Sequence, residues 1–375
     1  MILVHLHVTS EAYSVAMSSA LRPLVVGHRG APGYRPEHSL SGYLLALAQG
    51  ADAVEPDLVS SRDGVLVLRH ENELSGTTDI AERPEFADRR TTIEMEGRFV
   101  TGWFTEHFDW AELQTLYCRE RIPSVRSGSA RFDDIDRLLQ LDDLLDLLER
   151  HREETGRTTE LVLEIKHAGY FESIGLPLDE LIAGRLEARG WANDPRLTVE
   201  SFEKTVLGQL QRRGVRASWV YLIHKEGVAD DEIAQHGSAA PTFPEELTRM
   251  PQLALLVDGI SVDKKMLTKR KHAGGLADRL ADERRRVEAG GEPEPVGEHP
   301  LIVSAHAAGL LVYTWTFRPE RRFLASRFRG QGALDDKGSW RREFNWLVSA
   351  GIDGIFVDHP DLALQARSAL VPVTA

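Results

Sequence analysis

The sequence predicts an α/β fold, a distorted TIM (β/α)8 barrel with an insertion after its second strand hairpin. Three observations lead to this prediction. Short apolar strand signals alternate with helical patterns along most of the chain, which is typical of a parallel sheet closed as a barrel. Two of the strand signals lie too close together for a crossover helix, so one strand must run against the rest. A long stretch with few strand signals then follows this pair.

The composition suits one large globular domain. Of the 375 residues, 42% are hydrophobic, which is ordinary for a protein with a real core. The formal net charge of −13 argues against nucleic-acid binding or attachment to an anionic membrane as the main activity. No apolar run approaches the length of a membrane span, so we expect no stable membrane anchor.

The chain is expected to have an N-terminal extension at residues 1–20 and a barrel domain at residues 21–375, interrupted by an insertion at about residues 72–141. The extension is mildly apolar but lacks a basic start, which argues against a secretory signal. The single cysteine, Cys118, excludes an intramolecular disulfide. These observations favour a cytoplasmic location.

The first three strands carry an unusual set of polar side chains. The first strand signal, at residues 24–26, is followed by His28 and Arg29. The second and third signals, at residues 53–59 and 65–70, form the predicted hairpin. Centring its turn between Arg62 and Asp63 places Glu55 opposite His70, and Asp57 opposite Leu68. Side chains alternate with period two along a strand, so Glu55, Asp57 and His70 are predicted to share one face.

Two carboxylates and an imidazole would then crowd together on a buried strand pair. Burying that many charges is costly, and a divalent cation is the simplest compensation. An acid pair at this spacing also occurs on solvated strand faces, and a strand-end histidine is often structural. The combination of an acid pair, an arginine and two histidines within residues 28–70 favours a functional site.

A second polar strand lies at residues 161–166. Glu164 and Lys166 share one face of this otherwise apolar strand, whereas His167 is predicted to point to the other face. A structural salt bridge would explain the pair, and so would a functional site.

The remaining strand signals lie at residues 196–201, 219–223, 259–262 and 310–317, and the run at 354–360 returns the chain to the barrel. Helical patterns lie at 40–47, 110–116, 141–148 and 204–213. The helix at 40–47 is predicted to be capped by Ser39 or Ser41, to place Leu40, Leu44 and Leu47 on its inner face and to end before Gly50. Residues 268–298 are strongly charged and are predicted to be a solvated surface excursion. Within the insertion, residues 123–134 read as a polar loop. Four insertion aromatics are expected to pack the segment rather than wall a substrate: Trp103, Phe104, Phe108 and Trp110.

Several short motifs in their order along the chain resemble the glycerophosphodiester phosphodiesterases, in particular the periplasmic-type members with a longer insert. The motifs are HRG at 28–30, PEHS at 36–39, GADAVEPD at 50–57, DGVLV at 63–67, HE at 70–71 and TT at 77–78. The resemblance covers roughly residues 24–365. It implies that the insertion lies over the barrel mouth. The sequence departs from the family pattern at His38, where asparagine is usual. We do not expect His38 to be catalytic.

The resemblance also implies roles for particular residues. It makes His28 and His70 the general acid and base, and it places Arg29 and Lys166 on the phosphate. Trp315 would line the substrate's glycerol pocket. The metal ligands would be Glu55, Asp57 and Glu164. An oxygen-only ligand set suits one divalent cation, Ca²⁺ or Mg²⁺. Glu37, Asp358 and His359 are expected to fix loops rather than to take part in chemistry.

The implied function is metal-dependent hydrolysis of small glycerophosphodiesters to glycerol 3-phosphate and an alcohol. Two alternatives stay open from the sequence. A lysophospholipase D-like enzyme would need a wide apolar mouth, and a non-catalytic phosphodiester-binding barrel would show no turnover. The sequence contains no signal for an oligomeric state.

Overall fold

The computed structural model describes residues 22–268, 298–333 and 337–370. The predicted extension at residues 1–20 lies outside these ranges. So does the charged excursion predicted at 268–298, apart from its two end residues. Among the described helices, none is long and apolar enough to cross a membrane.

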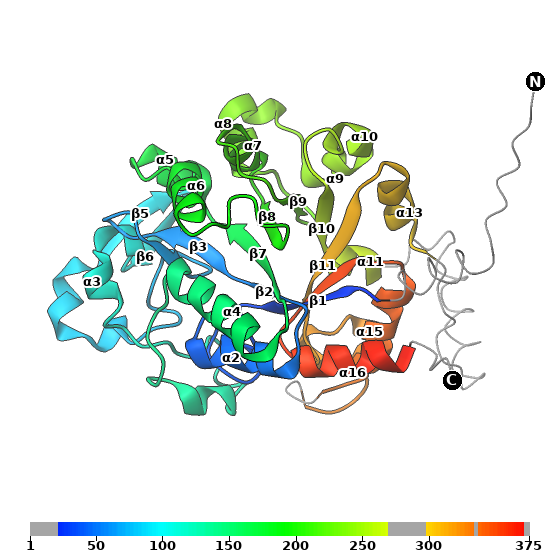
Figure 1. Ribbon diagram of the computed structural model, residues 1–375, viewed down its shortest axis with the longest axis horizontal. Coiled ribbons are helices and arrows are strands. Elements are labelled where there is room, and N and C mark those ends of the chain that lie inside the picture. Colours follow the sequence, from blue (N-terminus) through cyan, green and yellow to red (C-terminus); the bar gives the residue numbers. More distant parts are fainter. Residues whose placement is uncertain (1–21, 269–297, 334–336, 371–375) are drawn as a thin grey trace, which may run out of the picture.

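Parallel strands form a closed barrel at the centre of the described chain (Figure 1). The first strand pairs with both the second and the last, and the second also pairs with β7, so the ring has no parallel edge. This confirms the predicted (β/α)8 barrel. Its strands are β1 (Leu24–His28), β2 (Ala53–Glu55) continued by β3 (Asp57–Ser60), β7 (Glu160–Ile165), β8 (Leu197–Ser201), β9 (Ser218–Ile223), β10 (Gly259–Asp263), β11 (Leu311–Phe317) and β12 (Gly354–Val357).

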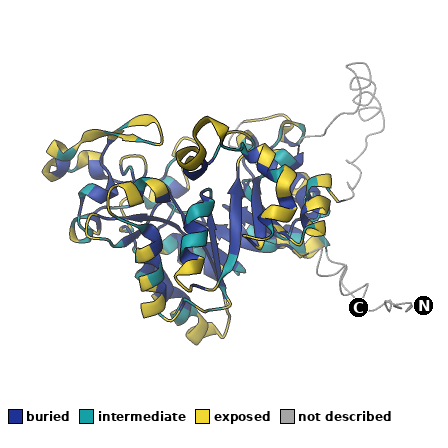
Figure 2. Cartoon of the chain, turned by 90° about the horizontal axis from the view of Figure 1, so that it is seen from above, coloured by how far each residue is buried: buried dark blue, intermediate teal, exposed yellow. Residues whose placement is uncertain are grey.

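Helices surround the barrel strands and turn their exposed faces outward, whereas the barrel strands are mostly buried (Figure 2). The longer ones are α2 (Leu40–Gln49), α4 (Leu141–Thr155), α6 (Leu178–Ala188), α7 (Lys204–Arg212), α8 (Asp230–His236), α13 (Pro300–Ala307), α15 (Trp340–Ser349) and α16 (Pro360–Leu370). Shorter ones are α3 (Trp110–Leu113), α5 (Ala168–Ser173), α9 (Phe243–Glu246), α10 (Met250–Leu253), α11 (Lys264–Thr268) and α14 (Ser326–Arg329).

The predicted hairpin is present, but its register differs by one residue. Strand β4 (Leu66–Leu68) runs antiparallel to β3 and pairs Leu58 with Leu68. Asp57 therefore lies opposite Arg69 and not opposite Leu68. The turn is one residue longer than predicted because Gly64 adopts a φ of +79° and the Ser61 hydroxyl accepts the Val65 N–H at 2.9 Å.

Helix α2 begins and ends where the sequence predicts, but two of its inner-face residues were predicted wrongly. Ser39 caps the helix by accepting the Gly42 N–H at 3.1 Å, and Gly50 ends it in a left-handed conformation. Leu47 is buried, whereas Leu40 and Leu44 are 38% and 48% exposed. The buried face runs instead through Tyr43, because the Tyr43 hydroxyl reaches the polar centre of the barrel described below.

Between β4 and α4 the chain leaves the barrel and forms a two-stranded sheet, β5 (Thr91–Met95) and β6 (Arg98–Gly102). Of the four aromatics predicted to pack here, Trp103, Phe104 and Phe108 are buried, and Trp110 is partly buried against the core. The polar loop at residues 123–134 contains the buried side chain of Arg126, so its composition did not mean exposure. The limits given to the insertion, residues 72–141, stay a prediction. The segment between β4 and α4 also contains short 3₁₀ turns: η1 (Ile80–Glu82), η2 (Pro84–Arg89), η3 (Thr105–His107) and η4 (Ser129–Phe132).

Candidate active site

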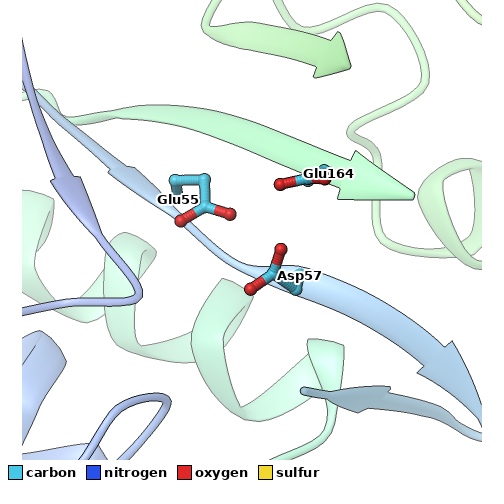
Figure 3. A group of neighbouring side chains, drawn as sticks. All are labelled: Glu55, Asp57 and Glu164. Atoms are coloured by element: carbon cyan, nitrogen blue, oxygen red, sulfur yellow. The ribbon is translucent and has the colours of Figure 1, made fainter. Parts of the chain in front are cut away.

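Three buried carboxylates meet where β2 continues into β3 and both pair with β7. Glu55 ends β2, Asp57 begins β3, and the parallel register places Asp57 beside Glu164 of β7. Each residue offers an oxygen, and these oxygens all lie within 4.8 Å of one another. Figure 3 shows the three carboxylates gathered around one space. The structure thus brings together the predicted metal ligands.

Basic side chains surround the carboxylate of Asp57. Its carboxylate lies 2.9 Å from Arg29 Nε and 3.0 Å from Lys166 Nζ, and the His38 Nε2 atom is 2.9 Å away. Burial by itself would raise the pKa of Asp57, but Lys166 and Arg29 outweigh burial and hold this pKa well below its usual value. Asp57 is therefore charged throughout the physiological range.

The other two carboxylates have the opposite tendency. Burial and the nearby Asp57 and Glu164 carboxylates raise the pKa of Glu55 well above its usual value. Burial raises the pKa of Glu164 to about 8, with Lys166 opposing the shift and Asp57 adding to it. The Glu55 Oε1 atom is buried and has no hydrogen-bond partner. An orphaned oxygen in a carboxylate cluster is what a divalent cation would satisfy, so these residues fit such an ion.

Each predicted catalytic histidine is held by a carboxylate through the same ring atom. His28, at the end of β1, bonds from Nδ1 to Asp358 Oδ1 at 2.8 Å. His70, just after β4, bonds from Nδ1 to Glu71 Oε1 at 2.6 Å. Burial and Arg29 lower the pKa of His28 to about 4, and burial with Arg29 and Lys166 lowers the pKa of His70. Both imidazoles are therefore neutral at pH 7.

A cavity of about 480 Å³ opens onto this group. Of the eight site residues predicted from the sequence, six line it: His28, Arg29, His70, Glu164, Lys166 and Trp315. The other two, Glu55 and Asp57, are completely buried. Trp315 forms one aromatic wall, with Phe202 edge-on at 5.7 Å and His224 edge-on at 5.4 Å between ring centres. Acidic side chains line another part of the wall: Glu96, Glu203 and Asp230.

The structure corrects the prediction for His167. This residue lines the cavity instead of pointing to the other face. Strand β7 ends at Ile165, and His167 has a φ of +52°, so the period-two alternation no longer applies to it. The His167 ring forms an ion pair with Glu96 at the tip of the β5–β6 hairpin.

Two acids expected only to fix loops contact the site directly. Asp358 holds His28, as described above, and Glu37 lies 3.3 Å from Arg29 Nη1. Glu200 of β8 was not among the predicted site residues. It is buried, pairs in register with Glu164, lines the cavity and has an unpartnered Oε2 atom. The signal available for Glu200 was an acid in an otherwise apolar strand, the same signal that identified Glu164.

A sequence model of the glycerophosphoryl diester phosphodiesterase family matches residues 28–362, from the first catalytic candidate to the last helix. The chain belongs to this family. It is 27% identical over 350 residues to a glycerophosphodiester phosphodiesterase of Arabidopsis thaliana, covering 90% of this chain and 84% of the relative. The resemblance expected from the motifs is thereby confirmed, and the chain is an enzyme of the glycerophosphodiester phosphodiesterase family.

Solved structures share the fold at low sequence identity. A glycerophosphoryl diester phosphodiesterase from Silicibacter pomeroyi, described as putative, superposes with a TM-score of 0.59 at 20% identity, covering 94% of this chain and 98% of its own. A phosphodiesterase from Oleispira antarctica, solved with its product sn-glycerol-3-phosphate, gives a TM-score of 0.53 at 19% identity, with 94% and 99% covered. At these identities the comparison supports the fold alone.

Proposed function

We propose that this enzyme hydrolyses small glycerophosphodiesters to sn-glycerol 3-phosphate and an alcohol, using a divalent cation and two histidines. The observation that carries the proposal is the convergence of three buried carboxylates and two carboxylate-held imidazoles on one cavity. The family to which the chain belongs supports the substrate class.

The cation would be held by Glu55, Asp57 and Glu164. Their oxygen-only set suits Ca²⁺ or Mg²⁺ better than zinc. When bound, such an ion offsets the negative charge of the phosphoryl group undergoing transfer.

The substrate's phosphate would lie against Arg29 and Lys166, which line the cavity beside the carboxylates. The planar guanidinium can donate two parallel hydrogen bonds to phosphate oxygens, and the ammonium adds a point charge. Trp315, on the aromatic wall, would pack against the glycerol carbons.

His28 and His70 would move the protons. One imidazole takes the proton of the attacking nucleophile on its free nitrogen. The other must first take up a proton from solvent on its own free nitrogen, and it then supplies that proton to the leaving alkoxide. Neutral imidazoles that line the cavity are suited to begin as acceptors, and each ring has one nitrogen left after its bond to a carboxylate. The geometry is symmetric enough that it assigns neither role to one ring in particular.

A panel of glycerophosphodiesters assayed with added Ca²⁺, Mg²⁺ or Mn²⁺ tests the proposal. We expect release of glycerol 3-phosphate from glycerophosphocholine or a related diester. A lysophospholipid assayed in parallel tests the lysophospholipase D alternative, which the acidic side chains of the cavity wall do not favour. Absence of turnover with every diester and every cation would contradict the proposal and leave the non-catalytic binding barrel.

A further inference from the structure

Two arginines in one short stretch of the excursion between β4 and α4 reach into the active site. Arg121 binds Glu71 through Nη1 at 2.9 Å and Nη2 at 2.7 Å, and it binds Glu37 through Nε at 2.8 Å and Nη2 at 2.6 Å. Glu71 is the carboxylate that holds His70. The contacts therefore run in an unbroken line from Arg121 through Glu71 to one catalytic candidate.

Arg126 does the same for the other histidine. Its Nη2 atom lies 2.6 Å from Asp358 Oδ2, while Asp358 Oδ1 holds His28. The Arg126 side chain is 6% exposed, and its other nitrogens donate to Glu320 at 2.6 Å and to the Pro32 carbonyl at 3.0 Å. Arg318 also donates to Asp358 Oδ2, at 2.6 Å. Asp358 is thus fixed from two sides, and Arg126 itself is fixed by three acceptors.

The two series of contacts, Arg–carboxylate–His in each case, have the same chemistry. In each, a carboxylate accepts from imidazole Nδ1, which places the ring hydrogen on Nδ1 and leaves Nε2 as the free nitrogen. The guanidinium then holds the carboxylate. In Glu71 it holds both oxygens, and in Asp358 it holds the oxygen that the histidine does not use. Charge-assisted bonds of this kind restrict orientation more than neutral bonds do.

We propose that Arg121 and Arg126 are positioning residues, which hold His70 and His28 in the Nδ1–H tautomer through Glu71 and Asp358. A single stretch of chain would then orient both histidines, and the segment between β4 and α4 would serve catalysis. This inference rests on the proposed function for the catalytic effect, but its statement about the two tautomers stands independently of activity.

Substitutions Arg121→Met and Arg126→Met test the inference, with Arg119→Met as the matched control. Arg119 lies in the same stretch, but its guanidinium binds only the exposed carboxylates of Glu82 and Asp134. We expect each test variant to lower kcat on the order of 10-fold or more while KM changes little, as for other supports of a functional histidine. Arg119→Met should match the wild type. A raised KM with unchanged kcat would show that Arg121 binds substrate instead, and it would overturn the inference for that residue.

A second readout does not depend on turnover. Ring ¹⁵N spectra of the metal-free enzyme, assigned with His28→Ala and His70→Ala, report which nitrogen carries the hydrogen. We expect Nδ1–H at both rings in the wild type, and tautomer exchange at His70 in Arg121→Met and at His28 in Arg126→Met. Unchanged spectra in both variants would overturn the inference even if activity fell. A wild type with no turnover but the expected spectra would refute the proposed function alone.

Arg126 is buried, so its methionine variant can fail to fold. Arg126→Lys keeps the charge but loses the fork that reaches Glu320 and Asp358 together. Asp358→Asn keeps the volume of the carboxylate and removes its charge. If both fold and both keep the wild-type tautomer and kcat, Arg126 has no positioning role.

Discussion

At the scale of single residues, the site is defined by charge that is buried but compensated. Asp57 is the centre of this arrangement because Arg29, Lys166 and His38 each have a nitrogen within 3.0 Å of its carboxylate. Burial and the neighbouring carboxylates raise the pKa values of Glu55 and Glu164, and nearby positive charge opposes these shifts only in part. A cation bound among the three carboxylates would offset their negative charge.

Replacing either histidine should remove acid–base help. We expect His28→Ala and His70→Ala each to lower kcat on the order of 10²- to 10⁴-fold, the usual scale for this loss. Steady-state rates of the purified variants on glycerophosphocholine measure the effect. His236→Ala, which changes a half-exposed histidine on α8, serves as the control and should keep the wild-type rate. Near-normal rates in either test variant would remove that histidine from the mechanism.

The sequence identified residues whose chemistry is visible locally and missed those whose partners lie far along the chain. Glu164 and His70 stand out because a charged group ends or interrupts an apolar strand. Arg126 does not stand out, because its partner Asp358 is 232 residues away and its own neighbours are polar. The polar composition around Arg126 does not predict its burial, because the ion pair with Asp358 comes from a distant part of the chain.

At the scale of elements, strand position was more predictable than strand register. Every strand expected for the barrel is present, since runs of apolar and β-branched residues bounded by polar turns are a strong signal. The hairpin register depends instead on the conformation of a few turn residues, and Gly64 changed it by one. On α2, the inner face was set by the tyrosine that bonds His38, which hydrophobic spacing does not reveal.

The cap of α2 should contribute measurably to stability. Ser39 accepts the Gly42 N–H and donates to the Pro36 carbonyl at 2.6 Å. The residue is buried and directly follows His38. We expect Ser39→Ala to lower the free energy of unfolding by about 1 kcal/mol, as for other N-caps. Urea denaturation measures this change. Ser173→Ala, at an exposed serine in α5, should stay within about 0.5 kcal/mol of the wild type. Equal stabilities of the two variants would contradict the role of the cap.

At the scale of the whole molecule, a cation held by the carboxylate cluster would stabilise the fold. The three buried acids offer oxygens that lie within 4.8 Å of one another, and a ligand that binds only the folded state stabilises it. Treatment with EDTA should therefore abolish turnover, and addition of Ca²⁺ or Mg²⁺ should restore it and raise the Tm. In Glu164→Gln the rise in Tm should be smaller, because one ligand charge is gone. If EDTA changed neither the activity nor the Tm, the metal site would be excluded.

Acid should destabilise the fold through His359. Burial lowers the pKa of His359 to about 4, and its buried Nδ1 has no hydrogen-bond partner. The folded protein therefore binds fewer protons here than the unfolded chain, so stability falls as the pH decreases from about 6.5 to about 4. We expect His359→Gln to lose less stability over this range than the wild type, by about 1–3 kcal/mol. Parallel acid dependences of the two proteins would contradict this assignment.

The closure of the barrel also determines when activity can arise during synthesis. His28 ends the first strand, and Asp358, which holds it, follows the last strand, 330 residues later. A nascent chain emerging from the ribosome thus carries its first histidine without the carboxylate that orients it. Competence for hydrolysis should appear late and abruptly, once β12 docks against β1, and a chain truncated before Asp358 should be inert even if the earlier strands have folded.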